Sequence, residues 1–525
     1  MRALLAAAAL APALLAAQTP DVSADRYSFY LVVGDRDTVI TERVWRMPAQ
    51  IHGEFLEHQR GARVSYVAAL AADASITTVA AHTYRSAADT AGEIATFEVS
   101  GDQVVAQIGA SERARIPGAV GLVPMINPSA AFIEQVIRRA LVINRGLLTP
   151  GATATLPVLV IGAPQSVTAT VTGVSADSVV LSYASVTMRL AVAADGRLLG
   201  GRAPSQGLTI VRGPAGDPLV APVKDYTAPP GAPYRAQDVT IRTPAGIRLT
   251  GTLTLPTGVR GPVPAVVTIT GSGPEDRDEQ SPALPAYRPF RQLADTLGRR
   301  GIAVLRLDDR GMGGSDVGPR TVTSEDFADD IRAGVAYLRT RSEIDCARIA
   351  LVGHSEGGVI APIVAESDPK LRGMVLMAAT ASPGSVILRS QQHYLVDTVA
   401  KLAGEARESA LAQYQRNTDS VAAAVPWLRW FIEHDPSAVA RRVRTPVLIV
   451  QGEADHQVPA SEAEKLAAAF RAGGNRRVTV RTFPETNHLF VTDTTGGFAY
   501  ERLPSLDVRR DVLGAIAGWL ADTLR

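Results

Sequence analysis

Between residues 26 and 212, apolar and β-branched residues come in short runs that are interrupted by polar and glycine-containing turns. Apolar and polar positions alternate in 94–99, and the longer run 179–192 is rich in β-branched residues. Both patterns predict strands, because successive side chains of a strand point to opposite faces. One stretch, 131–141, places its apolar residues on one face of a helix. We therefore expect a β-rich domain over residues 18–212 with one helix.

A proline-rich stretch, residues 213–236, follows this region. Its prolines are Pro214, Pro218, Pro222, Pro229, Pro230 and Pro233. Segments of this composition are semi-rigid and commonly connect domains. We therefore expect a linker here and the domain boundary within it.

From residue 237 to 525 the pattern changes, and short apolar runs alternate with longer amphipathic stretches. Runs such as 265–270 and 349–352 predict buried strands, and stretches such as 325–340 predict helices. This alternation is typical of a mostly parallel sheet with helices on both faces. The predicted fold is therefore α/β. The alternation lapses at about 381–445, where we expect a helical cap inserted over the site.

The expected cap contains an aromatic stretch, Pro-Trp-Leu-Arg-Trp-Phe, at 426–431. These side chains could line an acyl pocket, or they could only pack the cap onto the sheet. The pattern favours neither interpretation over the other.

Composition supports a folded chain and narrows its partners. The residues are 46% hydrophobic and 20% charged, and the formal net charge is +1. With no long run of lysine and arginine, nucleic acid is not expected as the main partner.

Residues 1–17 carry one arginine and then an Ala- and Leu-rich stretch, which is typical of a secretory signal. A disordered Ala-rich terminus or an uncleaved anchor would have a similar composition. No segment is long and apolar enough for a stable membrane span.

The chain has one cysteine, Cys346, so an intramolecular disulfide is excluded. An exported protein without disulfides fits the bacterial periplasm or exterior better than a eukaryotic secretory route. Because Cys346 lies just before an apolar run, we expect it to be a small buried packing residue.

The stretch Gly353-His354-Ser355-Glu356-Gly357 matches the nucleophile-elbow pattern Gly-x-Ser-x-Gly. In this pattern a sharp turn between a strand and a helix exposes the serine, and the glycines allow strand and helix to approach closely. The five-residue match alone is weak, but an apolar strand precedes it and a predicted helix follows it. We therefore predict Ser355 to be a nucleophile at the C-terminal edge of the sheet.

A serine hydroxyl needs a base to accept its proton. In this fold an acid and then a histidine follow the serine along the chain. Asp455 and His488 each come after a predicted strand, in that order, so we predict them to be the acid and the base. Glu453 is the alternative acid. His354 is expected to pack or to border the pocket. The remaining histidines are expected in packing or solvent roles: His52, His58, His82, His393, His434 and His456.

Two backbone amides are expected to bind the oxyanion that forms during acyl transfer. One belongs to Glu356, directly after the nucleophile. The other is expected from the loop after the strand 265–270, and we predict the amide of Ser272, with Gly273 as the alternative. The acidic run that follows, up to residue 279, is expected to be solvated or to tie down this loop.

Other motifs point to no bound group. The glycine-rich stretch 308–315 lacks the lysine of a phosphate loop and is expected to form a wall beside the site. No metal-ligand spacing such as His-Glu-x-x-His occurs. We therefore expect neither a cofactor nor a metal.

Five motifs in this order resemble bacterial α/β-hydrolases near the dienelactone-hydrolase and prolyl-oligopeptidase branch, many of which are esterases. The motifs are Gly-Ser-Gly-Pro-x-Asp-Arg-Asp-Glu at 271–279, Asp-Arg-Gly-x-Gly-x-Ser at 309–315, Gly-His-Ser-Glu-Gly-Gly at 353–358, Gly-x-x-Asp-x-x-Val-Pro at 452–459 and Asn-His at 487–488. The resemblance covers about 237–525 and implies that Ser355, Asp455 and His488 form the triad.

Together these features predict an α/β-hydrolase that cleaves small carboxylic esters of short or medium acyl chains through an acyl-enzyme. The same triad would serve a peptidase or an acyltransferase. A third hypothesis, from another class, is an envelope-associated binding protein whose hydrolase domain is inert.

Overall fold

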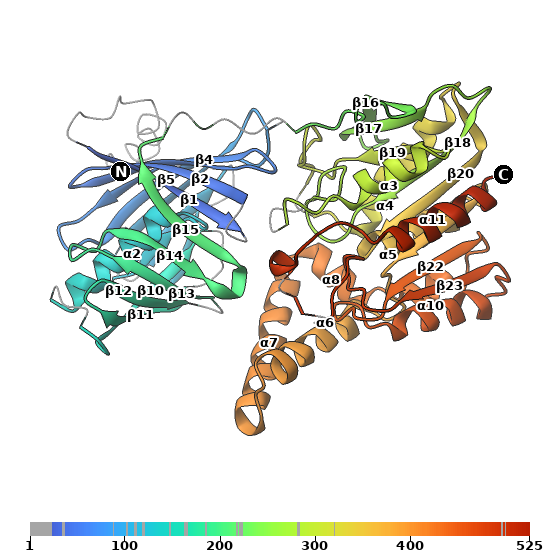
Figure 1. The fold of residues 1–525 in the computed structure, drawn as a ribbon. Coiled ribbons are helices and arrows are strands. Elements are labelled where there is room, and N and C mark those ends of the chain that lie inside the picture. Colours follow the sequence, from blue (N-terminus) through green and yellow to red (C-terminus); the bar gives the residue numbers. More distant parts are fainter. Residues whose placement is uncertain are drawn as a thin grey trace. The chain divides into compact units, whose positions relative to one another are not determined.

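The computed structural model describes residues 24–525 apart from short gaps. The gaps are 34–36, 88, 101–102, 110–112, 118–120, 146–148, 162–165, 184–185, 217–218, 220–223, 281–283, 320, 495–496 and 499. The chain divides into two compact units, Met1–Val223 and Lys224–Arg525 (Figure 1). The predicted signal at 1–17 lies outside the described residues. Within the described part, no helix has the length and apolar character needed to cross a membrane.

The first unit is built on a sheet of 15 strands in the order β8-β7-β6-β5-β4-β3-β2-β1-β15-β14-β13-β12-β11-β10-β9. Neighbouring strands pair antiparallel, as β1 does with β2 and β15, whereas β9 and β10 are parallel. The strands are β1 (Asp25–Val33), β2 (Asp37–Arg46), β3 (Gln50–Glu57), β4 (Ala62–Leu70), β5 (Ile76–Tyr84), β6 (Glu93–Ser100), β7 (Gln103–Ile108), β8 (Ala114–Pro117), β9 (Val123–Met125), β10 (Thr153–Val160), β11 (Val167–Ser175), β12 (Ser178–Tyr183), β13 (Val186–Val192), β14 (Leu198–Ala203) and β15 (Leu208–Pro214), with a short 3-10 helix η1 (Pro204–Gln206). The run 179–192 thus forms two antiparallel strands, β12 and β13.

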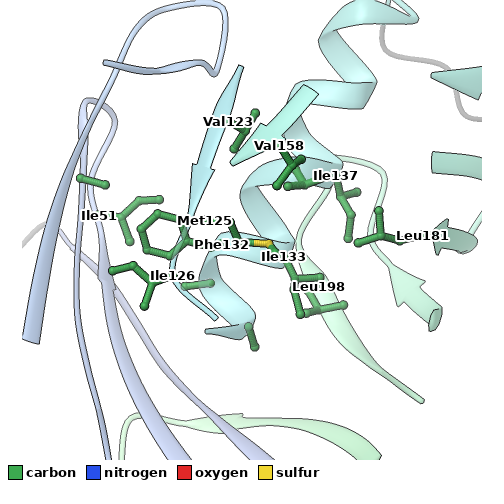
Figure 2. Close-up of a cluster of buried hydrophobic side chains, with 14 of the residues drawn as sticks. Ile51, Val123, Met125, Ile126, Phe132, Ile133, Ile137, Val158, Leu181 and Leu198 are labelled. Carbon is green, nitrogen blue, oxygen red and sulfur yellow. The ribbon is translucent and has the colours of Figure 1, made fainter. Parts of the chain in front are cut away.

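Helix α2 (Ala130–Ile143) supplies the centre of this unit's core, as the pattern at 131–141 predicts. Figure 2 shows α2 between Ile51 on one side and Leu181 on the other, and all of these belong to one buried cluster. The buried carboxylate of Glu42 accepts hydrogen bonds from the first amides of the helix, those of Ala130 and Ala131. Negative charge at a helix N-terminus is stabilising, so Glu42 fixes α2 against the sheet.

The second unit contains an eight-stranded sheet in the order β16-β17-β19-β18-β20-β21-β22-β23. β16, β17 and β19 pair antiparallel, and from β19 onward all neighbours are parallel. The strands are β16 (Tyr234–Arg242), β17 (Arg248–Pro256), β18 (Val263–Ile269), β19 (Ala303–Leu307), β20 (Ile344–His354), β21 (Gly373–Met377), β22 (Val447–Gly452) and β23 (Val478–Phe483). A mostly parallel sheet is therefore observed where one is predicted.

Helices cover both faces of this sheet, and its strands are buried on both sides. Val267 belongs to the buried cluster that contains residues of α4, α5 and α10, whereas its neighbour Val266 belongs to the cluster that contains residues of α3 and α11. This division follows from the alternation of side chains along a strand. The helices are α3 (Pro289–Gly298), α4 (Ser324–Arg339), α5 (Glu356–Ser367), α10 (Ser461–Ala472) and α11 (Arg510–Thr523), with a 3-10 turn η3 (Tyr500–Arg502).

Between β21 and β22 the chain forms a helical insertion, which Figure 1 draws in orange. Its helices are α6 (Gly384–His393), the π-helical η2 (Tyr394–Val399), α7 (Gly404–Ala424), α8 (Pro426–Glu433) and α9 (Pro436–Ala440). α7 contains no buried residue, whereas Trp427 and Phe431 of α8 line a cavity with Ser355.

One expectation about this unit is wrong. Cys346 is exposed rather than buried. The pairing of β18 with β20 is irregular between Ile344 and Ile349, and the residues between them therefore lie outside the regular ladder. The expected linker is not wholly a connector either. Lys224 and Tyr226 both bind the buried carboxylate of Asp276, at 2.6 and 3.0 Å, so this part of the segment belongs to the second unit.

Candidate active site

A cavity of about 460 Å³ opens beside the C-terminal ends of the parallel strands. Its lining includes Ser355, His488, Ser272 and Glu356. All four are predicted site residues and come from three different loops. The fifth, Asp455, lies directly behind His488.

Ser355 stands alone between β20, which ends at His354, and α5, which begins at Glu356. Its φ is 54° and its ψ is −115°. This conformation is unfavourable in free energy for a residue that carries a side chain. A Cβ on Gly353 would clash with the carbonyl oxygen of Gly357, and one on Gly357 with that of Ile269. The two glycines therefore permit the close strand–helix packing that the sharp turn requires.

The imidazole of His488 is held by Asp455. Its Nδ1 lies 2.8 Å from Oδ2 of Asp455, and both residues are buried. The carboxylate is fixed in turn, since its Oδ1 accepts from the amides of Gln457 and Val458, at 2.8 and 2.9 Å, and its Oδ2 from the side chain of Gln451. An ionised Asp455 makes Nδ1 the protonated nitrogen and leaves Nε2 as the base.

The loop after β18 passes directly beside Ser355, the predicted nucleophile. A Cβ built on Gly271 would lie 3.5 Å from Cβ of Ser355. The Gly271 amide already donates to both Glu275 and Glu279, at 3.0 Å each. Ser272, whose amide is the predicted oxyanion donor, comes next along the loop and lines the cavity with Ser355, whereas the alternative Gly273 does not line it.

The acidic run after this loop is not solvated. Asp276, Asp278 and Glu279 are buried, and Glu275 and Glu279 hold the Gly271 amide. The alternative expectation, that the run ties down the loop after β18, is the one observed. Burial, and then the neighbouring charges of Glu279 and Asp309, hold the pKa of Glu275 well above its usual range.

His354 connects β20 to the loop that carries His488 and to the acidic run after β18. Its Nε2 lies 2.9 Å from the carbonyl oxygen of His488, and its Nδ1 lies 2.6 Å from Oε1 of Glu279. Burial alone would lower the pKa of His354, but Glu279 opposes this and the pKa is raised above its ordinary value. This role was missed by the sequence reasoning, although a histidine next to the nucleophile and an acidic run in the oxyanion loop were both visible.

The side chain of Glu356 joins the cap to the site. It accepts hydrogen bonds from Trp427 at 2.7 Å, from Ser324 at 2.6 Å, and from Ser272. Burial raises the pKa of Glu356 in spite of these three donors. The residue that supplies the predicted oxyanion amide therefore also fixes the cap helix α8 and the oxyanion loop.

The competing residues lie elsewhere. The alternative acid, Glu453, is exposed and accepts from Thr482. His456 stacks on Tyr394 of the cap at 4.2 Å. No group of three or more potential ligands for a metal ion is found among the described residues.

Residues 286–495, which include Ser355, Asp455 and His488, match the family model described as serine aminopeptidase, S33. The esterase EstD of Thermotoga maritima is 29% identical over 303 residues, which are 56% of this chain and 69% of EstD. These matches support an α/β-hydrolase family esterase. The α/β-hydrolase fold predicted from its motifs is thus confirmed.

One further relative is named only as uncharacterized, and the similar solved structures have lower sequence identity. An uncharacterized protein of Mycobacterium tuberculosis is 30% identical over 237 residues, 44% of this chain and 66% of that protein. The structure of the Pyrococcus furiosus esterase Pf2001 covers 57% of this chain and 95% of its own, with 17% identity and a TM-score of 0.41. Est1E of Butyrivibrio proteoclasticus covers 55% and 98%, with 18% identity and a TM-score of 0.36.

Proposed function

We propose that this α/β-hydrolase cleaves carboxylic esters of short or medium acyl chains through an acyl-enzyme on Ser355. One observation carries the proposal. A strained serine at a strand–helix turn lines the same cavity as a histidine whose Nδ1 is bound to a buried aspartate. A serine becomes a nucleophile when a correctly oriented base can accept its proton.

In the first half-reaction Oγ of Ser355 attacks the ester carbonyl carbon while its proton passes to Nε2 of His488. Asp455 stabilises the resulting imidazolium. The carbonyl oxygen becomes an oxyanion that accepts from the amides of Glu356 and Ser272. The intermediate collapses, the C–O bond to the alcohol breaks, and His488 donates its proton to the departing oxygen.

In the second half-reaction water replaces the alcohol. His488 accepts a proton from the water as its oxygen attacks the acyl carbon, and the same two amides bind the second oxyanion. Ser355 leaves with the proton from His488, and the carboxylic acid is released. No cofactor is required for either half.

A second candidate function is an aminopeptidase with the same triad, which the match to the serine aminopeptidase model favours. The acylation chemistry is identical, but the leaving group is an amine. Comparing a p-nitrophenyl ester with the p-nitroanilide of the same acyl group distinguishes the two. Faster turnover of an anilide bearing a free α-amino group would favour the peptidase.

The test is covalent labelling of the full-length protein with a fluorophosphonate, combined with p-nitrophenyl ester turnover. We expect the label on Ser355, and we expect Ser355→Ala to lose both labelling and turnover while remaining folded. Ser342→Ala, a change at an exposed serine, is the matched control and should keep both. Turnover that persists in Ser355→Ala would overturn the assignment, and a wild-type protein that takes no label would favour the inert binding protein.

A further inference from the structure

A second cavity, the apolar chamber, is lined in part by the loop after β18, residues 270–274. Its volume is about 370 Å³, and it includes neither Ser355 nor His488. It shares Gly271, Ser272 and Trp427 with the cavity that holds the nucleophile. The two spaces therefore meet at the oxyanion loop and at one tryptophan of the cap.

The wall of the chamber is mainly apolar. Val317 and Val322 come from the loop before α4, Phe327 and Ile331 from α4 itself, and Trp427 from the cap. Protein interiors are close-packed, and voids much larger than a water molecule are few. A large apolar space next to a catalytic loop is therefore best explained as a binding site for an apolar group.

The ionisable residues in the lining are already paired with other protein groups. Arg310 binds Asp330 through two hydrogen bonds, at 2.7 and 2.9 Å. Asp308 pairs with Arg277 at 2.6 Å. Asp309 accepts from Thr270 at 2.8 Å. A charged group on a bound ligand would either lack a partner of opposite charge or take one from these pairs, and an unpaired charge in a buried site is costly. The chamber therefore suits an uncharged chain.

The direction of the reaction decides which part of the ester the chamber takes. His488 must donate its proton to the departing alcohol, so the alcohol lies on the His488 side of the carbonyl carbon. The acyl chain extends away from the leaving group, past the oxyanion loop. The chamber lies along that loop and does not include His488, which places the acyl chain in it.

We propose that the apolar chamber is the acyl-binding subsite and that the substrates are esters of uncharged, medium-length aliphatic acids. The alcohol occupies the nucleophile cavity, whose lining includes polar groups such as Gln391, Gln457 and Tyr500. This inference rests on the proposed ester hydrolysis at Ser355. Trp427 then serves both spaces and is held there by its hydrogen bond to Glu356.

The experiment measures kcat/KM of the full-length protein for p-nitrophenyl octanoate and p-nitrophenyl acetate, which share one leaving group. Val322→Trp fills the chamber, and we expect it to lower the octanoate-to-acetate ratio about tenfold or more. Phe327→Ala enlarges the chamber and should shift the preference toward longer chains, as measured with the decanoate. The two changes act from different segments, so failure of one variant to fold leaves the other as a test.

Two further variants serve as controls. Val259→Trp makes the same change at a valine that is 47% exposed and lines neither cavity, and its ratio should equal that of the wild type. Leu388→Trp lies in the nucleophile cavity on α6, and because it meets the common leaving group it should leave the ratio unchanged. A ratio that falls in Leu388→Trp and not in Val322→Trp would overturn the proposal and place the acyl chain under the cap.

Labelling separates the two proposals. If fluorophosphonate labels Ser355 and the ratio is the same in Val322→Trp, Phe327→Ala and the wild type, ester hydrolysis stands and the acyl assignment is wrong. If Ser355 takes no label, the proposed function itself fails, whatever the chamber binds.

Discussion

The backbone holds Ser355, the proposed nucleophile, at a positive φ that glycine adopts more readily than any other residue. The strain is the cost of exposing Oγ at the turn between β20 and α5. We predict that Ser355→Gly unfolds at higher denaturant concentration than Ser355→Ala, by about 1 kcal/mol in free energy of unfolding, because alanine keeps the strain. Neither variant should turn over ester. Equal stability of the two would show that the turn is not strained in solution.

Glu279 places a buried carboxylate against His354 and raises the pKa of that histidine above its ordinary value, against the effect of burial. A raised pKa in the folded state stabilises the protein below the unfolded pKa, about 6.5 for histidine. That stabilisation is lost as the pH rises through the folded pKa. Tyr287, Glu275, Asp455 and His488 are the other ionisable groups near this pair.

We therefore predict that Glu279→Gln destabilises the protein most at mildly acidic pH. The difference from wild type should shrink as the pH rises past the raised pKa of His354. Urea unfolding of both proteins from mildly acidic to alkaline pH measures this difference. Glu485→Gln, a change at an exposed glutamate, is the control and should show no such trend. A difference that grows with pH would mean that His354 is neutral in the folded protein.

At the scale of elements, α5 and α7 represent two extremes of packing. α5 buries most of its residues between the sheet and α4, whereas α7 buries none. An isolated helix is only marginally stable in water, and opening α7 breaks no core contact. We predict that backbone amides of α7 exchange with deuterium at least about tenfold faster than those of α5, as resolved by mass spectrometry of peptides. Comparable protection of both helices would indicate that α7 is covered by another surface in solution.

The elements of the hydrolase unit could be predicted because each has a strong local signal. Strands that are buried on both faces appear in the sequence as continuous apolar runs. The glycines of the nucleophile-elbow pattern indicate the turn at Ser355. The roles of Glu275 and Glu279 could not be predicted. They depend on the path of the chain after Gly271, which brings an acidic run inside, and a charge run in sequence is usually solvated.

Cys346 and Lys224 illustrate the same limit. The exposure of Cys346 comes from an irregular pairing of β20 with β18, which leaves no trace in the pattern of apolar residues. Lys224 lies in a segment whose composition indicates a linker, but a carboxylate distant in sequence, Asp276, binds it. In both cases long-range pairing overrides local composition.

The described residues form three hydrophobic clusters, one in the first compact unit and two, on opposite faces of the sheet, in the second. Each unit therefore contains the apolar contacts that a folded domain needs. Every residue of the proposed mechanism belongs to Lys224–Arg525. We predict that a chain starting at residue 224 folds and retains turnover of p-nitrophenyl acetate, since it keeps the contacts of Lys224 and Tyr226 with Asp276.

A chain that starts at residue 231 lacks those two contacts, and its behaviour tests how far the segment belongs to the hydrolase unit. Asp276 is 1% exposed, and its Oδ2 accepts from both Lys224 and Tyr226. Removing the donors of a buried carboxylate should cost about 2 kcal/mol, seen as a lower unfolding temperature than that of the longer chain. Lys224→Ala in the full-length protein separates the loss of this contact from the effect of truncation. If both shortened chains unfold at the same temperature, residues 224–230 act only as a connector, and the oxyanion loop does not depend on them.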